Sequence, residues 1–301
     1  GNPYSAPVSA TVEMYSMAYI NENLPDDDLD KFNWQFFGIP MRSLSPLPPE
    51  PDTGWYIRWL REDLTGYSKW QNLTVNDMLT SFRGYELAQP GEKIYTFKGI
   101  LENRDTTIAL TKSAVPYYAG QHLLANPYTA SINISDMVFG ANTEATVYIY
   151  HSGSYADWNE DQENGRLGTG RGQYLAVPQN AASLILPAIP SMQGFIVRAT
   201  ANQGSVSIPY VSATRNTTRQ RAKKISPVNP YLAVELSGQR ALDRVWLLYE
   251  STASKQFDNG WDGFKMFSKE GSAMIYANEP AGDLQVNTVN DFNDIYLHFV
   301  P

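Results

Sequence analysis

The segment Pro190-Ser-Met-Gln-Gly-Phe-Ile-Val-Arg-Ala199 joins the two signals that recur along this chain, a turn and a short apolar run. Pro, Ser and Gly favour turns, and the run after Gly194 is rich in strand-forming residues. Similar runs cover residues 11–19, 34–41, 55–60, 94–101, 107–111, 122–128, 145–150, 173–177, 205–210, 232–236, 245–249, 264–267 and 295–300. This spacing predicts an all-β fold of tandem antiparallel β-sandwich or jelly-roll modules.

The composition supports this fold class and narrows the function. The chain has 19 Tyr, 12 Phe and 7 Trp, while 21 Gly and 19 Pro separate the apolar runs. Only residues 26–31 and 76–82 suggest short helices. The net charge of -8 disfavours binding to nucleic acid or insertion at an anionic membrane, and the absence of Cys excludes disulfides and thiolate sites. No apolar stretch reaches the roughly 20 residues of a membrane helix.

Four short blocks appear twice in the same order, which indicates an internal duplication. The matched ranges are 34–40 with 121–127, 55–58 with 147–150, 66–70 with 154–158, and 81–85 with 191–195. We therefore expect two related sandwich modules, residues 1–114 and 115–225. Residues 226–301 lack these blocks, so they are expected to form a diverged β segment that packs on the second module and is truncated.

Several blocks resemble β-rich regions of secreted and cell-surface proteins of the Bacteroidetes, many of them clients of type IX secretion. Leu124-Ala-Asn-Pro-Tyr128 and Ile189-Pro-Ser-Met-Gln-Gly-Phe-Ile-Val197 are similar to the "GNPYPS" and "MQGFFV" strands of that group. Phe257-Asp258 and Trp261-Asp-Gly-Phe-Lys265 are similar to its "fD..yDa.K" turn. The resemblance implies export, an extracellular or outer-membrane surface location, and a longer parent polypeptide. It is silent on the ligand.

No motif predicts catalysis. The chain has three His and contains neither HExxH nor GxSxG, and its 31 acidic residues supply carboxylate pairs everywhere without marking a site. The sequence therefore predicts a protein that is not an enzyme, has no catalytic residues and needs no cofactor.

Two acidic loops have the oxygen-rich spacing that calcium prefers. The first carries Asp157, Asn159 and Asp161, and the second carries Asp258 and Asp262 around Gly260. The alternative is that these carboxylates bind nearby backbone amides in tight turns. We treat structural calcium as a hypothesis for both loops.

Aromatic residues in polar loops are the best functional signal. Tyr67 and Trp70 follow a strand of the first module, and Tyr155 and Trp158 occupy the matched loop of the second. Sugar rings and hydrophobic partners both stack on such side chains. We interpret the chain as a binding or adhesion module of a larger secreted protein, with a glycan or a host or surface protein as partner. The alternatives are a carbohydrate-binding accessory region of a polysaccharide-degrading enzyme and a structural spacer or assembly subunit of a surface complex.

Overall fold

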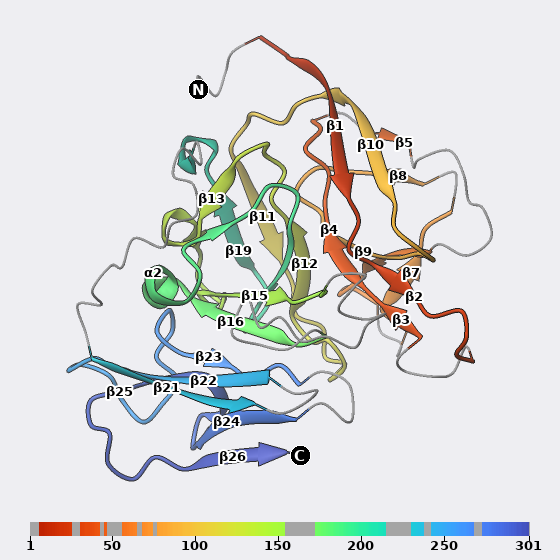
Figure 1. Ribbon diagram of the computed structural model, residues 1–301. Helices are drawn as coiled ribbons and strands as arrows, with labels where there is room; N and C mark the ends of the chain where they lie inside the picture. The colour runs from red at the N-terminus through yellow and green to blue at the C-terminus, as the bar shows by residue number, and fades with distance from the viewer. Residues whose placement is uncertain are drawn as a thin grey trace. The chain divides into compact units, whose positions relative to one another are not determined.

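The computed structural model describes residues 6–25, 31–42, 45–46, 56–64, 68–74, 77–153, 172–214, 230–237, 242–267 and 273–300. The predicted all-β class is confirmed, because several sheets of mainly antiparallel strands dominate these residues (Figure 1). The expected helix at 76–82 is wrong: Met78–Leu79 form a strand that pairs with Ser45–Pro46. The other expected helix, at 26–31, falls largely outside the described residues.

The contacts divide the chain into two compact units. Unit 1 comprises residues 1–144 and 188–219, and unit 2 comprises residues 145–187 and 220–301. These units do not follow the expected modules 1–114, 115–225 and 226–301, which stay a prediction about independently folding parts.

Unit 1 contains two sets of strands, which we call the first and the second repeat. The first repeat comprises β1 (Ser9–Tyr15), β2 (Tyr19–Ile20), β3 (Phe32–Asn33), β4 (Gln35–Phe37), β5 (Ser45–Pro46), β6 (Tyr56–Leu60), β7 (Trp70–Asn72), β8 (Met78–Leu79), β9 (Tyr85–Ala88) and β10 (Ile94–Ile100). The second repeat comprises β11 (Thr106–Leu110), β12 (Gln121–Ala125), β13 (Ser131–Asn133), β14 (Val138–Phe139), β17 (Ala188–Ile189), β18 (Gly194–Arg198), β19 (Gly204–Ile208) and β20 (Ala213–Thr214), with 3-10 turns at Ile134–Asp136 and Tyr210–Ser212.

In the first repeat the sheet β4-β9-β6-β7 has one face turned to the core. Strand side chains alternate between the two faces, and Phe37, Ile57, Tyr85 and Leu87 fall on the same face. All four are at most 3% exposed and belong to one hydrophobic cluster. The pairing of β1 with β10 adds Met14, Tyr95 and Phe97 to that cluster. The opposite face of the β4-β9-β6-β7 sheet carries the surface described in the next section.

Two of the matched sequence blocks occupy equivalent strand pairs. In the first repeat β4 pairs with β9, and Phe37 lies opposite Tyr85. In the second repeat β12 pairs with β18, and Leu124 lies opposite Phe195. Phe37 matches Leu124 and Tyr85 matches Phe195 in the blocks, so the two pairs share one register. A one-residue slip would have exchanged the faces of the strands.

The turn before β9 and the turn before β18 each contact the opposite repeat. The amide of Gly38 donates to the carbonyl of Met192 over 2.9 Å, and the matched amide of Ala125 donates to the carbonyl of Phe82 over 3.1 Å. Phe82 and Met192 are themselves matched, and both have φ of 63°, a left-handed backbone that is uncommon for residues other than glycine. The repeats are thus related by an approximate two-fold axis.

Gly38 packs tightly against the second repeat. A Cβ atom on Gly38 would overlap the Cβ atom of Ala125, so the contact requires glycine on one side. Met192 also inserts its side chain into the first repeat, where it is 7% exposed and packs in the core. Phe82 packs edge-on against Tyr128 of the second repeat, with 5.9 Å between ring centres.

Unit 2 contains a pair of antiparallel strands and a larger sheet. The pair consists of β15 (Thr146–Tyr150) and β16 (Tyr174–Pro178), and a short 3-10 turn (Gln179–Ala181) and helix α2 (Ala182–Ile185) follow it. The sheet has the order β21-β22-β25-β24-β26, with β23 also paired to β25. Its strands are β21 (Tyr231–Ser237), β22 (Leu242–Tyr249), β23 (Gly263–Phe264), β24 (Met274–Glu279), β25 (Gly282–Val289) and β26 (Leu297–Val300). The pairing of β22 with β25 is parallel, a departure from the purely antiparallel expectation.

Candidate functional site

Of the four aromatic residues expected to bind a ligand, one falls in the described part of the chain. Trp70 begins β7 and is half-buried, so it is not on an exposed loop as expected. Tyr67, Tyr155 and Trp158 lie outside the described residues. The structure therefore brings together a different set of side chains around Trp70 than the sequence suggested.

The centre of this set is Arg58 on β6. Glu86 lies on the central strand β9, opposite Phe36 on β4 and opposite Arg58 on β6. All three side chains therefore lie on the face of the sheet that is turned away from the core cluster. The Arg58 guanidinium lies 3.7 Å from the ring centre of Trp34 and 5.6 Å from that of Trp70. A cation held over aromatic rings in this way is attracted by their π-electrons.

Glu86 fixes the position of this guanidinium. Its carboxylate is almost fully buried and forms an ion pair with Arg58. Burial raises the pKa of Glu86 to about 7, although the charge and the hydrogen bond of Arg58 act in the opposite direction. Arg58 is thus held from below by a carboxylate and from the sides by two indoles.

Further rings extend this array at both ends. Phe32 stacks on Trp34 with 5.6 Å between ring centres and meets Tyr56 edge-on at 5.3 Å. Tyr118 meets Trp70 edge-on at 6.2 Å. Tyr56 is 42% exposed and Tyr118 is 39% exposed, so both ends of the array reach solvent. We call Phe32, Trp34, Tyr56, Arg58, Trp70 and Tyr118 the aromatic surface; its rings offer stacking area for a flat sugar or an apolar side chain.

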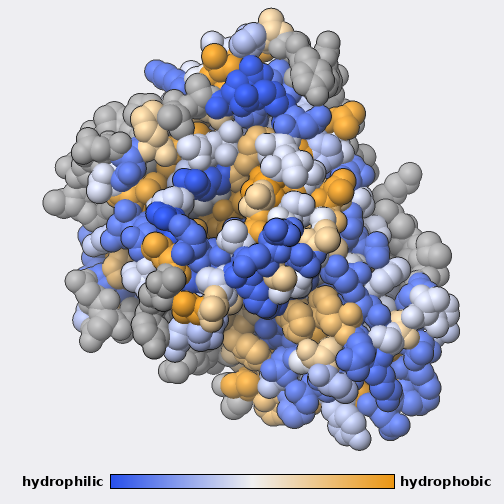
Figure 2. Space-filling model, turned by 180° about the vertical axis from the view of Figure 1, so that it is seen from behind, coloured by the Kyte–Doolittle hydropathy of each residue, from blue (hydrophilic) through white to orange (hydrophobic). Residues whose placement is uncertain are grey.

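Other exposed hydrophobic side chains are more dispersed. On the face shown in Figure 2, hydrophobic residues form several small groups separated by hydrophilic ones. Single exposed hydrophobic residues are normal on protein surfaces. The aromatic surface differs because its rings form two contacting groups, and the Arg58 guanidinium lies against one ring of each group.

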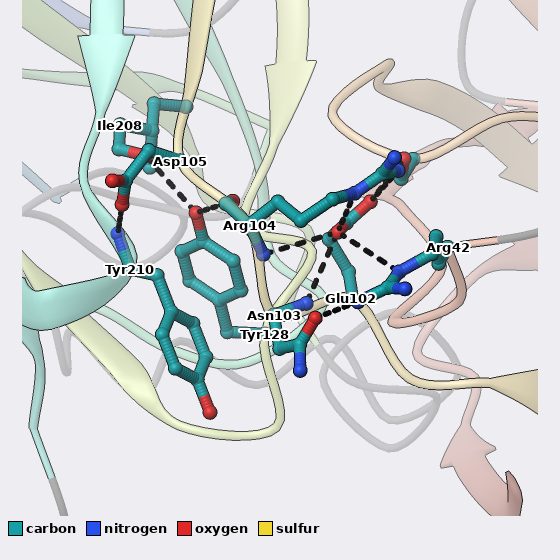
Figure 3. Close-up of polar contacts among 9 residues, drawn as sticks. Arg42, Glu102, Asn103, Arg104, Asp105, Tyr128, Ile208 and Tyr210 are labelled. Atoms are coloured by element: carbon teal, nitrogen blue, oxygen red, sulfur yellow. Dashed lines mark hydrogen bonds and ion pairs between the residues drawn. The ribbon is translucent and has the colours of Figure 1, made fainter. Parts of the chain in front are cut away.

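A polar network surrounds the segment 101–105, which connects the two repeats (Figure 3). The buried carboxylate of Glu102 accepts hydrogen bonds from Arg104 Nε at 3.0 Å, Arg104 Nη2 at 3.1 Å and Ser81 Oγ at 3.0 Å. It also accepts from the backbone amides of Asn103 and Arg104, and Arg42 lies 3.9 Å away. Burial alone would raise the pKa of Glu102, but these hydrogen bonds outweigh it and lower the pKa.

The other end of the segment is held by the second repeat. The Tyr128 hydroxyl lies 2.8 Å from the carbonyl oxygen of Arg104 and 3.0 Å from that of Ile208, and it can donate to either. The Asp105 carboxylate accepts the amide of Tyr210 at 2.7 Å. We call this segment with its partners the junction; its hydrogen bonds fix a backbone path.

A second buried carboxylate, Glu62, also bridges the repeats. Its oxygens accept the amides of Ser113 at 2.5 Å and Gly120 at 3.0 Å, and the hydroxyl of Thr111 at 2.8 Å. The fully buried Lys69 ammonium lies 3.5 Å away. Burial would raise the pKa of Glu62, but the hydrogen bonds outweigh this and lower it to about 2.

The described acidic loop of unit 2 uses its carboxylates as turn acceptors. Both oxygens of the buried Asp262 are engaged, accepting the amides of Asp258 at 2.8 Å and Thr288 at 2.7 Å. Asp258 in turn accepts the amide of Ser254 at 2.7 Å. Burial raises the pKa of Asp262 to about 7. Among the described residues no group of three or more acidic or histidine side chains could hold a metal ion.

The other calcium candidates, Asp157, Asn159 and Asp161, lie outside the described residues, so structural calcium stays a prediction. Lys265, next to the second loop, donates to the buried Asp243 over 2.6 Å. Both side chains are fully buried, and burial lowers the pKa of Lys265 although Asp243 acts in the opposite direction.

Comparison with known proteins links the chain to a fimbrial protein. No family model and no solved structure matches the chain. The chain is 31% identical, over 323 aligned positions, to the minor fimbrium subunit Mfa5 of Porphyromonas gingivalis. The alignment covers 99% of this chain and 26% of that protein, so the chain spans about a quarter of the relative's length. No helix in the described part of the chain is long and apolar enough to cross a membrane. The similarity to a fimbrium subunit agrees with the expected bacterial group and with a location at the cell surface.

Proposed function

We propose that this chain is a structural region of a larger cell-surface subunit and that it takes part in the assembly of a fimbria-like complex. The observation that supports this most is the similarity to a minor fimbrium subunit along 99% of the chain. This role corresponds to the structural or assembly alternative of the sequence analysis, and it requires no enzymatic activity.

The internal construction of unit 1 fits a structural role. The buried carboxylate of Glu62 and the reciprocal turn contacts connect its repeats, and the buried carboxylate of Glu102 holds the segment between them. Removing one partner from a buried, hydrogen-bonded ion pair is costly, so such groups hold one arrangement against alternatives. A subunit in a filament has to keep its shape when neighbouring subunits bind.

The proposal is tested on the surface of the bacterium that produces the chain. Filaments are sheared from the cells and purified, and the full-length parent protein is sought in them by mass spectrometry. A parent protein with an in-frame deletion of this region is the comparison. We expect the intact protein to co-purify with the filaments and the deleted form to be lost from them. Equal recovery of both forms would show that the region plays no part in assembly.

A second candidate function is adhesion through the aromatic surface. Stacked rings around a fixed guanidinium, with Tyr56 and Tyr118 exposed at its ends, suit a sugar or an apolar segment of another protein. A carbohydrate-binding accessory role would use the same rings. Glycan and matrix-protein arrays test both, with Trp70→Ala as the variant and Tyr296→Ala, a change of a 67% exposed ring in unit 2, as its control. A hit that survives Trp70→Ala would exclude this surface.

Export by type IX secretion and structural calcium belong to the same proposal. Calcium is tested by thermal unfolding with and without a chelator, because an ion that binds the folded chain alone raises Tm. An unchanged Tm would remove both acidic loops from consideration.

A further inference from the structure

The two repeats of unit 1 are connected once along the chain but contact each other at several places. Every strand pairing described within unit 1 joins two strands of the same repeat: the first repeat ends with β10 at Ile100, and the second begins with β11 at Thr106. Residues 101–105 are the covalent connection. All other contacts between the repeats are non-covalent and reach across the approximate two-fold axis.

These contacts are self-complementary. Arg83 of the first repeat forms an isolated antiparallel β-bridge with Leu124 of the second. Phe37, which matches Leu124, forms the equivalent β-bridge with Gln193, which matches Arg83. An interface with such two-fold symmetry uses the same patch on both sides, as in a symmetric dimer. The surface that the first repeat presents to its own second repeat is therefore equally suited to the second repeat of another molecule.

The junction decides which of these two partners is used. Glu102 accepts the amides of Asn103 at 3.0 Å and Arg104 at 3.2 Å, and both bonds lie inside the connecting segment. The Arg104 side chain folds back onto the same carboxylate. These local bonds fix the path of the segment that connects the two repeats, and a rearranged segment would lose them.

We propose that the interface between the repeats accepts the complementary repeat of a second copy of this chain, and that the hydrogen bonds of the junction keep it closed within one molecule. When residues 101–105 extend, two chains exchange their second repeats and remake the same contacts between molecules. The exchange needs no new surface, and it joins two subunits reciprocally. It does not depend on the proposed role in filament assembly.

The length of the connecting segment, residues 101–105, sets the balance between the closed monomer and the exchanged dimer. A short linker gives the attached repeat an effective concentration in the millimolar range. The closed monomer therefore dominates at micromolar concentration, and exchange rises when chains refold at high concentration. Loss of the bonds from Asn103 and Arg104 to Glu102 weakens the closed form, and changes in a hinge loop can promote exchange in this way.

The test uses a pair of cysteines in the full chain, which has no Cys of its own. Arg83 and Leu124 form an antiparallel bridge flanked by hydrogen bonds from Gly84 N to Leu123 O and from Ala125 N to Phe82 O. This pattern defines a non-hydrogen-bonded pair, with Cα atoms about 4.5 Å apart, which a disulfide can span. In Arg83→Cys/Leu124→Cys the disulfide forms within a chain in the monomer and between chains after exchange.

The double-cysteine chain is unfolded under reducing conditions, refolded at a series of concentrations up to the millimolar range, oxidised and separated without reductant. We expect a covalent dimer whose share rises with concentration, and at least a tenfold larger share at a fixed concentration when Glu102→Ala is added. Glu13→Ala, on the exposed face of β1, is the matched control and should leave the share unchanged. Single-cysteine chains set the background of random cross-linking.

Two results would overturn the proposal. The first is a disulfide that forms only within monomers at every concentration, with circular dichroism confirming that the chains are folded. The second is a dimer on a sizing column whose subunits separate without reductant, because the chains would then associate through another surface.

Discussion

Replacement of Glu62 by Gln tests how strongly the buried carboxylates hold unit 1 together. In the wild-type chain, hydrogen bonds from Ser113, Gly120 and Thr111 outweigh the effect of burial and lower the pKa of Glu62 from 4.5 to about 2. A shift of this size corresponds to about 3 kcal/mol of folding free energy at neutral pH. The glutamine side chain has the same shape but no charge, and it leaves the buried Lys69 ammonium without its carboxylate. We expect Glu62→Gln to lower the free energy of unfolding by about 3 kcal/mol at pH 7.

The pH dependence provides the sharper check. The pKa of Glu62 is lower in the folded chain than in the unfolded chain, so its contribution is fully present above pH 4.5 and is lost as the pH falls towards 2. The difference between wild type and variant should therefore shrink over that range. Urea unfolding followed by tryptophan fluorescence at pH 7, 4 and 3 measures it, with Glu13→Gln as the exposed control. A difference below about 1 kcal/mol at pH 7, or one that stays constant with pH, would refute the reasoning.

Three further predictions concern the other buried groups. Lys265→Met leaves the fully buried Asp243 without its cation and should lower the free energy of unfolding, measured by heat or urea, by about 3–5 kcal/mol. The double variant Lys265→Met/Asp243→Leu should lose clearly less stability, and equal losses would contradict this reasoning. Gly84→Ala places a Cβ atom 2.5 Å from the carbonyl oxygen of Leu124, so it should lower Tm by several degrees, and an unchanged Tm would show that the repeats can move apart there. The pKa of Glu86 is raised to about 7, so its contribution to stability is present below pH 4.5 and is lost as the pH rises to 7; Glu86→Gln should remove this part of the pH dependence, as a series of melting curves would show.

The sequence predicted the fold class well because strands of this kind carry their signal locally. Short apolar runs with turn residues between them correspond to β4, β6, β10, β12, β15 and β18. The matched blocks also predicted that β4 is equivalent to β12 and that the turn at 81–84 is equivalent to the turn at 191–194. Similar short sequences favour similar local structure. The parallel pairing of β22 with β25 had no such local signal.

Of the residues in the aromatic surface, the sequence analysis named only Trp70 as a binding candidate, and its role in binding stays a prediction. Trp70 was named because it follows a strand in a polar context, whereas Trp34 and Arg58 come from other strands. Their proximity depends on the register of β4, β9 and β6, which a sequence without the pairing does not contain. The alternation of Trp34 with Phe36, and of Tyr56 with Arg58, was the available signal that both strands present these residues on one face.

The buried carboxylates were missed for a related reason. Glu62 and Glu102 look like ordinary surface acids in sequence, because their partners are backbone amides and hydroxyls from distant segments. Asp258 and Asp262 show the reverse case. Their spacing suggested a cation, whereas the described contacts are with the amides of the same turn and of β25.

Immunogold electron microscopy of intact cells with an antibody against this chain tests the proposed assembly role most directly. The account predicts gold particles along or at the ends of surface filaments, and loss of this labelling together with the filaments when the cells are sheared. Labelling that stays evenly spread over the cell body after shearing, or that appears only inside the cell, would contradict it.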